Sequence, residues 1–283
     1  MINTSSSEAL VGYAVLMPLA PWEKPEIVAE ALASLEAQTW PASQLVVSCD
    51  GEPPAALHAV LQAARLPLEI VVGPGGEGVG PVLARGLLHC REELVLRADA
   101  DDWSLPERAA AQVSWMLKHP EVVVMGTPIN EFQDSVHEAL MQRWVPLESL
   151  AIARTARFRN PLNHPSVILR RNAVLAAGNY QAVRGFEDYQ LWLRLLAIHG
   201  SQALANTPQP LVMARVGPAH LSRRHGWRYV RSEARFLWRC GCSHLLPWVY
   251  VVGLLICRLP LRLIPPSLLS WTMARITRRP LPS

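Results

Sequence analysis

The stretch LVLRADADDWSLPERAAAQV, residues 94–113, decides the fold. Its first five residues, 94–98, form a mostly apolar run with the length of a buried strand. After an acidic loop, residues 106–118 carry a helical pattern that opens with proline, a residue favoured in the first turn of a helix. A buried strand that leads into a helix is the repeating unit of α/β folds, so this stretch predicts a fold of that class.

The same unit recurs along the first half of the chain. Runs that predict strands lie at residues 13–19, 45–49, 68–72 and 122–125, and helical patterns lie at 25–39, 54–65 and 79–90. This alternation requires a mostly parallel sheet with helices on both faces. Ligands of such sheets bind at the carboxyl ends of the strands. We therefore expect the chemistry near Ala20, Asp50, Gly73 and Asp99.

The alternation weakens beyond residue 128. There the pattern predicts a strand at 164–170, a helix at 188–198 and a late strand at 211–215. Past residue 221 the pattern predicts a helical, basic segment, which becomes strongly apolar from Leu245. We divide the chain into residues 1–128, residues 129–220 as the second half of the same domain, and a tail of residues 221–283.

The composition is that of a folded protein with unevenly distributed charge. Half of the 283 residues are hydrophobic and 18% are charged, which excludes wholesale disorder. Residues 1–200 hold 15 Lys and Arg against 22 Asp and Glu, whereas residues 201–283 hold 12 Arg, no Lys and one acid, Glu233. An acidic body with a basic tail points to anionic lipid or nucleic acid, and an Arg-rich solvated surface is the alternative.

The pattern of the cysteines and the N-terminal residues indicate the cellular compartment in which the protein works. Five cysteines without a CxxC spacing argue against a disulfide framework and favour a reducing cytosol. The opening MINTSSSEALVG has neither the basic region nor the apolar region of a signal peptide. We therefore expect a cytoplasmic protein.

Three carboxylates, Asp99, Asp101 and Asp102, follow the strand at 94–98 within four residues. They repel one another unless a cation lies among them. A divalent metal with a diphosphate fits, because hard oxygen ligands suit Mg²⁺ or Mn²⁺. The alternative is an acidic loop in which Asp102 caps the next helix.

Two adjacent acids, Glu187 and Asp188, open the helix predicted at 188–198. A helix N-terminus favours carboxylates, so a capping role explains them. Alternatively, one carboxylate serves as general base for an incoming hydroxyl.

A third motif, Gly73-x-Gly75-x-x-Gly78, matches the dinucleotide-binding spacing. It follows the third strand rather than the first and contains Pro74. The acid expected about 20 residues later is missing, apart from the aspartate loop itself. A nicotinamide-dependent oxidoreductase is therefore a weak alternative.

Six motifs occur in the order of a known family: VLMP at 15–18, QTWP at 38–41, CDG at 49–51, RADADDWSLPERAAAQV at 97–113, NHPSVILRR at 163–171 and GFEDYQLWLRLL at 185–196. The chain resembles family 2 glycosyltransferases with the GT-A fold, of the bacterial cell-surface polysaccharide type. The resemblance implies metal-dependent, inverting transfer of a sugar from a nucleoside-diphosphate donor to a hydroxyl of a glycan or lipid-linked acceptor, in lipopolysaccharide, capsule or exopolysaccharide synthesis. It makes residues 1–128 the nucleotide-sugar half and residues 129–220 the acceptor half.

The resemblance also implies residue roles. Asp188 corresponds to the catalytic base, with Glu187 beside it to orient the acceptor region, which also includes His164 and Trp192. The implied donor-binding residues are Pro18, Ala20, Asp50, Arg85 and Asp99, and the implied metal ligands are Asp99 and Asp101. His220 is a further candidate ligand, because Gly217 stands where the family often has histidine.

Two departures from the pattern keep a second alternative open. Cys49 stands where the family often has an acid, and Gly217 stands where the family often has histidine. A third departure, Glu77 where phosphate is expected, bears on donor contacts. A degenerate, non-catalytic assembly factor at the membrane is therefore the alternative to an enzyme.

The tail decides where the protein works. Residues 245–257 would form a helix of about 20 Å, short of the roughly 30 Å hydrocarbon core of a bilayer. An interfacial helix with Trp248 and Trp271, flanked by arginines, fits an anionic membrane. We expect no nucleic acid partner and a peripheral position on the inner face of the cytoplasmic membrane. A helix packed on the body is the alternative.

Overall fold

The computed structural model describes residues 11–217, 226–263 and 278–279. Within these ranges seven strands form the main sheet, in the order β10-β6-β9-β4-β1-β2-β3. Their bounds are β1 Tyr13–Leu19, β2 Gln44–Cys49, β3 Leu68–Val72, β4 Leu94–Arg97, β6 Val124–Gly126, β9 Ile168–Arg170 and β10 Leu204–Asn206. Every pairing in this sheet is parallel except those of β9, which runs antiparallel to β4 and to β6. The predicted α/β fold with a mostly parallel sheet is confirmed.

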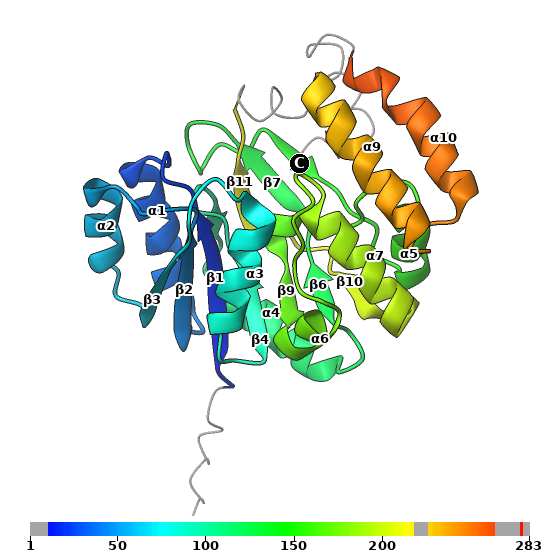
Figure 1. The fold of residues 1–283 in the computed structure, drawn as a ribbon. Helices are drawn as coiled ribbons and strands as arrows, with labels where there is room; N and C mark the ends of the chain where they lie inside the picture. The colour runs from blue at the N-terminus through cyan, green and yellow to red at the C-terminus, as the bar shows by residue number, and fades with distance from the viewer. Residues whose placement is uncertain (1–10, 218–225, 264–277, 280–283) are drawn as a thin grey trace, which may run out of the picture.

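Helices cover both faces of the sheet (Figure 1). The core on one face includes residues from α1 Pro25–Glu36, α2 Ala55–Gln62 and α4 Arg108–Lys118. The core on the other face includes residues from α3 Val79–His89, α5 Ser149–Ala156, α6 Arg171–Ala176 and α7 Glu187–His199. Strand β1 supplies Val15 and Met17 to the first core and Ala14 and Leu16 to the second, which is why its sequence is apolar without alternation.

A second, smaller sheet lies beside the main one. Its order is β12-β8-β7-β11-β5, formed by β5 Trp103–Ser104, β7 Ile129–Phe132, β8 Met141–Arg143, β11 Val212–Arg215 and β12 Arg278–Arg279. Strand β11 pairs antiparallel with β5, although more than 100 residues separate them. This pairing brings Arg215 beside the aspartate loop.

Several predicted boundaries are wrong. The helices expected at 25–39 and 54–65 end at Glu36 and Gln62, and the strand expected at 122–125 begins at Val124. The strand expected at 164–170 begins only at Ile168, because His164–Ser166 form a 3-10 turn around Pro165, which has no N–H to donate. Helix α4 begins at Arg108 and not at Pro106, because Pro106 and Glu107 form a turn after β5, in which the N–H of Arg108 donates to the carbonyl of Leu105 at 3.0 Å.

The tail forms a hairpin of two helices, α9 Trp227–Cys242 and α10 Trp248–Arg258. The inner side of α9 packs on α7 and shares a core with it, in which Phe236, Leu237 and Cys240 of α9 are buried. The view in Figure 1 shows α9 alongside α7 with α10 outside it. The inner side of the tail is therefore packed on the body. Among the described residues, no helix combines the length and the apolar character needed to cross a bilayer.

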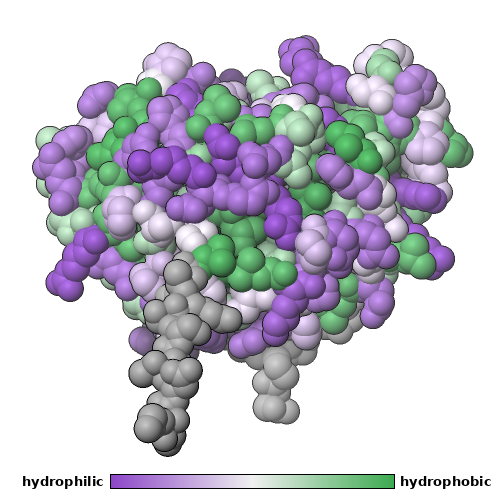
Figure 2. Space-filling model, turned by 90° about the horizontal axis from the view of Figure 1, so that it is seen from below, coloured by the Kyte–Doolittle hydropathy of each residue, from purple (hydrophilic) through white to green (hydrophobic). Residues whose placement is uncertain are grey.

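The five thiols are free and differ in exposure. Cys49, Cys90 and Cys240 are buried, whereas Cys242 and Cys257 are exposed on the hairpin. On the face of the molecule seen from below, which carries the amino ends of strands such as β1, hydrophilic and hydrophobic residues are intermixed (Figure 2). The carboxyl ends of the parallel strands, with the aspartate loop after β4, lie at the opposite edge of the sheet (Figure 1).

Candidate active site

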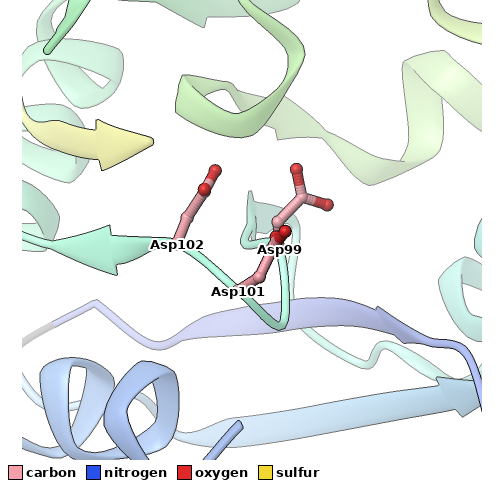
Figure 3. Close-up of side chains that lie close together, drawn as sticks. All are labelled: Asp99, Asp101 and Asp102. Carbon is pink, nitrogen blue, oxygen red and sulfur yellow. The ribbon is translucent and has the colours of Figure 1, made fainter. Parts of the chain in front are cut away.

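The aspartate loop between β4 and β5 carries a cluster of carboxylates. Asp99, Asp101 and Asp102 project from it (Figure 3), and one carboxylate oxygen from each lies within 4.8 Å of those from the other two. Strand β4 ends at the edge of the sheet, and only a short loop connects it to β5. The three side chains on this loop therefore lie close together. The predicted grouping is therefore present in the structure.

A buried arginine supplies one positive charge to this cluster. Arg97, at the end of β4, is 4% exposed, and its guanidinium forms two contacts with Asp99, one of them at 2.5 Å between Nη1 and Oδ2. Burial lowers the pKa of Arg97, but Asp99 raises it, and the net shift is upward, so Arg97 is charged. The sequence did show the signal, a charged residue inside an apolar run directly before three acids.

The remaining two carboxylates are not neutralised by Arg97. Burial, together with the charge of Asp99 and then Glu23, raises the pKa of Asp101 to about 7. Burial, together with the charges of Asp99 and then Asp101, raises the pKa of Asp102 well above its usual range. Three clustered oxygen donors with excess negative charge are the ligand set that suits Mg²⁺ or Mn²⁺, so the residues present fit a divalent cation.

Two arginines fix the shape of the loop. The backbone N–H of Arg215 donates to Asp102 Oδ1 at 2.9 Å, so Asp102 binds β11, and the expectation that it caps α4 is wrong. Buried Arg108 donates to Ser104 Oγ at 2.9 Å and to the carbonyl of Arg97 at 2.7 Å. The bond to Ser104 explains why the SLPER motif, residues 104–108, contains both a serine and an arginine. The two side chains together hold the end of the aspartate loop to the start of α4. Sequence reasoning missed Arg215, since the β5–β11 pairing leaves no local signal.

The predicted donor residues line the neighbouring strand ends. The N–H of Asp50 donates to the carbonyl of Leu19 at 2.8 Å, which places Asp50 beside Pro18 and Ala20 at the exit of β1. The Asp50 carboxylate accepts the backbone N–H groups of Glu77 at 2.9 Å and Gly78 at 3.2 Å. Asp50 therefore holds the glycine-rich loop to the end of β2.

The same loop explains the departure at Glu77. Arg85 Nη1 donates to Glu77 Oε2 at 2.5 Å, and Arg85 Nη2 donates to the carbonyl of Cys49 at 3.0 Å. Gly75 has a φ of +90°, and a Cβ at this position would lie 3.4 Å from Gly51 Cα. The glycine spacing thus serves a close packing of two loops.

A second acidic site lies at the start of α7. Asn160 Nδ2 donates to Asp188 Oδ2 at 2.5 Å, and the N–H of Tyr189 donates to Asp188 Oδ1 at 2.7 Å. Burial, and then the charge of Asp188, raise the pKa of Glu187 to about 7. Asn160 was missed, because its contact with Asp188 spans 28 residues and no spacing rule predicts it.

Of the predicted acceptor residues, His164 lies next to Asp188, and Trp192 lies next to His164. His164 Nδ1 is 3.9 Å from Asp188 Oδ2, and His164 Nε2 is 3.1 Å from the Tyr180 hydroxyl. Burial and the charge of Arg97 lower the pKa of His164 well below its usual range, so the imidazole is neutral and the contact with Asp188 is not an ion pair. Trp192 is fully buried and lies edge-on to His164, with ring centroids 5.9 Å apart, so it supports His164 from inside the core. His220 lies outside the described residues.

The family model for "Glycosyl transferase family 2" matches residues 22–178, more than half of the chain. The chain belongs to glycosyltransferase family 2. It is a glycosyltransferase, and the alternative of a nicotinamide-dependent oxidoreductase is wrong. The alternative of a non-catalytic assembly factor finds no support among relatives that are named as glycosyltransferases.

Two relatives and one solved structure show the extent of the likeness. The glycosyltransferase is 39% identical over 225 residues to the amylovoran biosynthesis glycosyltransferase AmsE of Erwinia amylovora, across 79% of this chain and 83% of that protein. It is 28% identical over 269 residues to the Escherichia coli UDP-Gal:alpha-D-GlcNAc-diphosphoundecaprenol beta-1,3-galactosyltransferase, across 94% of this chain and 97% of that protein. The mannosyltransferase PcManGT from Pyrobaculum calidifontis, solved in complex with GDP-Man and Mn²⁺, has a TM-score of 0.61 at 14% identity and covers 93% of this chain and 74% of that one. This likeness confirms the GT-A fold.

Proposed function

We propose that the protein transfers a sugar from a nucleoside-diphosphate donor to a hydroxyl of a lipid-linked glycan, with inversion at the anomeric carbon. The observation that carries this proposal is that one buried segment, residues 164–167, is joined to both acidic sites. His164 Nδ1 is 3.9 Å from Asp188 Oδ2, and the carbonyl of Val167 accepts the backbone N–H of Arg97, whose guanidinium contacts Asp99. A proton acceptor and a cation site at the two ends of this segment would fit direct displacement.

The donor half would bind the nucleotide and the diphosphate. Pro18, Ala20 and Asp50 lie at the ends of β1 and β2, and Arg85 lies behind the glycine-rich loop. Asp101 and Asp102, with Asp99, would hold Mg²⁺ or Mn²⁺, which when bound neutralises charge on the diphosphate leaving group. The Mn²⁺ and GDP-Man of the solved mannosyltransferase support this proposal.

The base would be Asp188. Its carboxylate accepts N–H groups from Asn160 and from the backbone of Tyr189, which fix the orientation of its two oxygens. The carboxylate would take the proton of an acceptor hydroxyl as the bond to the anomeric carbon forms and the nucleoside diphosphate leaves. Glu187, with a pKa of about 7, carries a proton in part of the population, which lessens its repulsion of Asp188. A single displacement with one base gives inversion.

The acceptor is proposed to be anionic and bound to a lipid. A hollow of about 550 Å³ is lined by Trp227, Arg228, Val230 and Arg231 on the first turn of α9. Tyr229, on the same turn, contacts Phe186, two residues before Asp188. Two cations on the helix whose first turn contacts Phe186 would fit an acceptor with a diphosphate, as in the name of the Escherichia coli relative.

The protein would work on the inner face of the cytoplasmic membrane, in bacterial cell-surface polysaccharide synthesis. The outer side of the hairpin exposes apolar side chains, with Val249 75% and Ile256 68% exposed on α10. Arg228, Arg231 and Arg235 are exposed along α9. An apolar stripe beside a basic one fits an anionic lipid surface.

A donor panel tests the reaction. We would measure nucleotide release from UDP-galactose, UDP-N-acetylglucosamine, GDP-mannose and dTDP-rhamnose with MnCl₂, with water as the acceptor, for the wild type and Asp188→Asn. One donor should turn over, EDTA should abolish the release, and Asp188→Asn should lower it by about 10²–10⁴-fold while the donor still binds. A variant with wild-type turnover would exclude Asp188 as the base.

A further inference from the structure

The C-terminal hairpin contacts both chain segments that hold the Asp188 carboxylate. One segment is the start of α7, which the chain enters through Phe186. The other is the loop that carries Asn160, the donor to Asp188 Oδ2. The family match ends at residue 178, so α7 and the hairpin both lie outside it.

Helix α9 supports the residues directly before Asp188. Ser232 Oγ donates to the carbonyl of Arg184 at 2.6 Å. The rings of Phe186 and Phe236 are stacked with their centroids 4.6 Å apart and their planes at 5°, and both side chains are buried. Since Phe186 is the N-cap residue directly before α7, a change in this stack would move the first turn of the helix.

Helix α10 supports the other segment. Tyr250 lies edge-on to Phe158, with ring centroids 5.3 Å apart. Arg258 Nη1 donates to the carbonyl of Phe158 at 3.3 Å. Phe158 lies two residues before Asn160. A displacement of α10 would therefore shift the side-chain amide of Asn160 that donates to Asp188.

A buried acid joins the two helices. Glu233 of α9 is fully buried and forms ion pairs with Arg258 and with Arg262, the second at 2.8 Å. Such a buried ion pair tolerates little displacement, because a shifted partner leaves an uncompensated charge. The two supports therefore move as one unit.

We propose that the α9–α10 hairpin is a positioning element of the active site, which holds the Asp188 carboxylate through Phe186 and Asn160. The inference rests on the proposed function, in which Asp188 is the base. Ser232 and Phe236 are then positioning residues and not catalytic ones. A misplacement of about 1 Å can cost about 10²-fold in rate, so their contribution is measurable.

Hydrogen exchange tests the geometry without any substrate. In full-length Phe236→Leu and Ser232→Ala, the amides of residues 157–162 and 184–190 should exchange at least about tenfold faster, and those of residues 94–104 should not change. Cys242→Ser, which changes an exposed side chain on α9, is the matched control and should exchange like the wild type. Unchanged exchange at 184–190, or an equal increase along the whole chain, would overturn the proposal.

A double-mutant cycle tests the coupling to Asp188. With the most active donor of the panel, MnCl₂ and water as acceptor, Phe236→Leu should lower kcat about tenfold and leave the donor KM within about twofold. In the Asp188→Asn background the same substitution should change turnover less than about twofold, because there is no base left to misplace. Equal losses in both backgrounds would show a merely structural role and overturn the inference. Wild-type turnover by Asp188→Asn alone would overturn the base assignment on which it rests.

Discussion

At the scale of single residues, the three acids of the aspartate loop differ in their electrostatic surroundings. Asp99 is paired with Arg97, whereas burial and mutual repulsion raise the pKa values of Asp101 and Asp102. Three acids that are neighbours in the sequence therefore have opposite effects on stability. Substitutions can separate these effects.

Asp99→Ala should unfold more easily than the wild type. It leaves the Arg97 guanidinium buried without its carboxylate, a loss that typically costs about 3–5 kcal/mol. Chemical denaturation would measure the change. Asp101→Asn is the matched comparison, and in the metal-free protein it should be as stable as the wild type or more stable, because it removes a repelled charge. Equal losses in the two variants would contradict the assigned roles.

The cation site predicts a second property of Asp101→Asn. Removal of one ligand charge should weaken Mn²⁺ binding by more than about tenfold. Substitution of a residue that only orients a metal ligand already lowers metal affinity by about 10–100-fold. Titration calorimetry with MnCl₂ would measure the affinity, with Glu121→Gln, an exposed acid before the amino end of β6, for control. If both variants bind Mn²⁺ like the wild type, the cluster is not the metal site.

Glu187 predicts a dependence of stability on pH. Its pKa in the folded chain is raised to about 7 from 4.5, so the protonated form stabilises the fold. That contribution is complete below pH 4.5 and is lost as the pH rises through about 7. The wild-type Tm in metal-free buffer should therefore fall between pH 5 and pH 8 more than that of Glu187→Gln, as differential scanning fluorimetry would show. Parallel curves would contradict the shift.

At the scale of elements, the sequence predicts strands β1 to β4 and, further along the chain, α4, β6, α7 and β11, but it misses β5, β7, β8, β10, α5 and α6. Strands β1, β2 and β4 are apolar runs that are buried along most of their length, and β3 is an apolar run at the edge of the sheet. Each is followed along the chain by a helix, so the local pattern is sufficient. Strands β5 and β11 are short, and their pairing depends on contacts across more than 100 residues. The acids of the site were predicted because they are clustered in sequence. Asn160 and Arg215 were not, because only the folded chain brings them to those acids.

The hairpin predicts a strong effect of one buried substitution. Glu233→Gln should leave two arginines near a neutral amide and destabilise the protein by about 3–5 kcal/mol. Urea denaturation would measure this, with the exposed Glu26→Gln expected within about 0.5 kcal/mol of the wild type. Deletion of residues 241–283 would be a poorer test of the tail, because it removes Leu246, Val251 and Leu254 from the core shared with α7.

At the scale of the whole molecule, the acidic body and the basic hairpin give the protein two electrostatic sides. The one acid of residues 201–283, Glu233, is buried in ion pairs, so the exposed charge on the described part of the hairpin is positive. The body carries the cation site and the proposed base. This polarity would orient the molecule on an anionic bilayer.

Replacement of Arg228, Arg231, Arg235 and Arg239 by Gln should weaken binding to vesicles that contain phosphatidylserine, since each arginine near such a surface contributes about 1 kcal/mol. Co-sedimentation would measure the bound fraction, and raised salt should have the same effect on the wild type. The matched variant with four Lys should bind like the wild type. Binding that ignores both salt and the four substitutions would show that charge does not attach the protein to lipid.

The two exposed cysteines of the hairpin, Cys242 at the end of α9 and Cys257 near the end of α10, have a practical consequence. Burial and then the charge of Glu52 raise the pKa of Cys49 to about 11, and burial raises the pKa of Cys240 to about 12. These two buried thiols therefore stay protonated and inaccessible to reagents, whereas the exposed Cys242 and Cys257 react with maleimides. The native chain thus carries its own attachment points for a polarity-sensitive fluorophore, without any engineered residue. A blue shift of the emission from the labelled Cys257 when vesicles are added would report entry of α10 into the headgroup region, and the label on Cys242 would report the same for the turn of the hairpin.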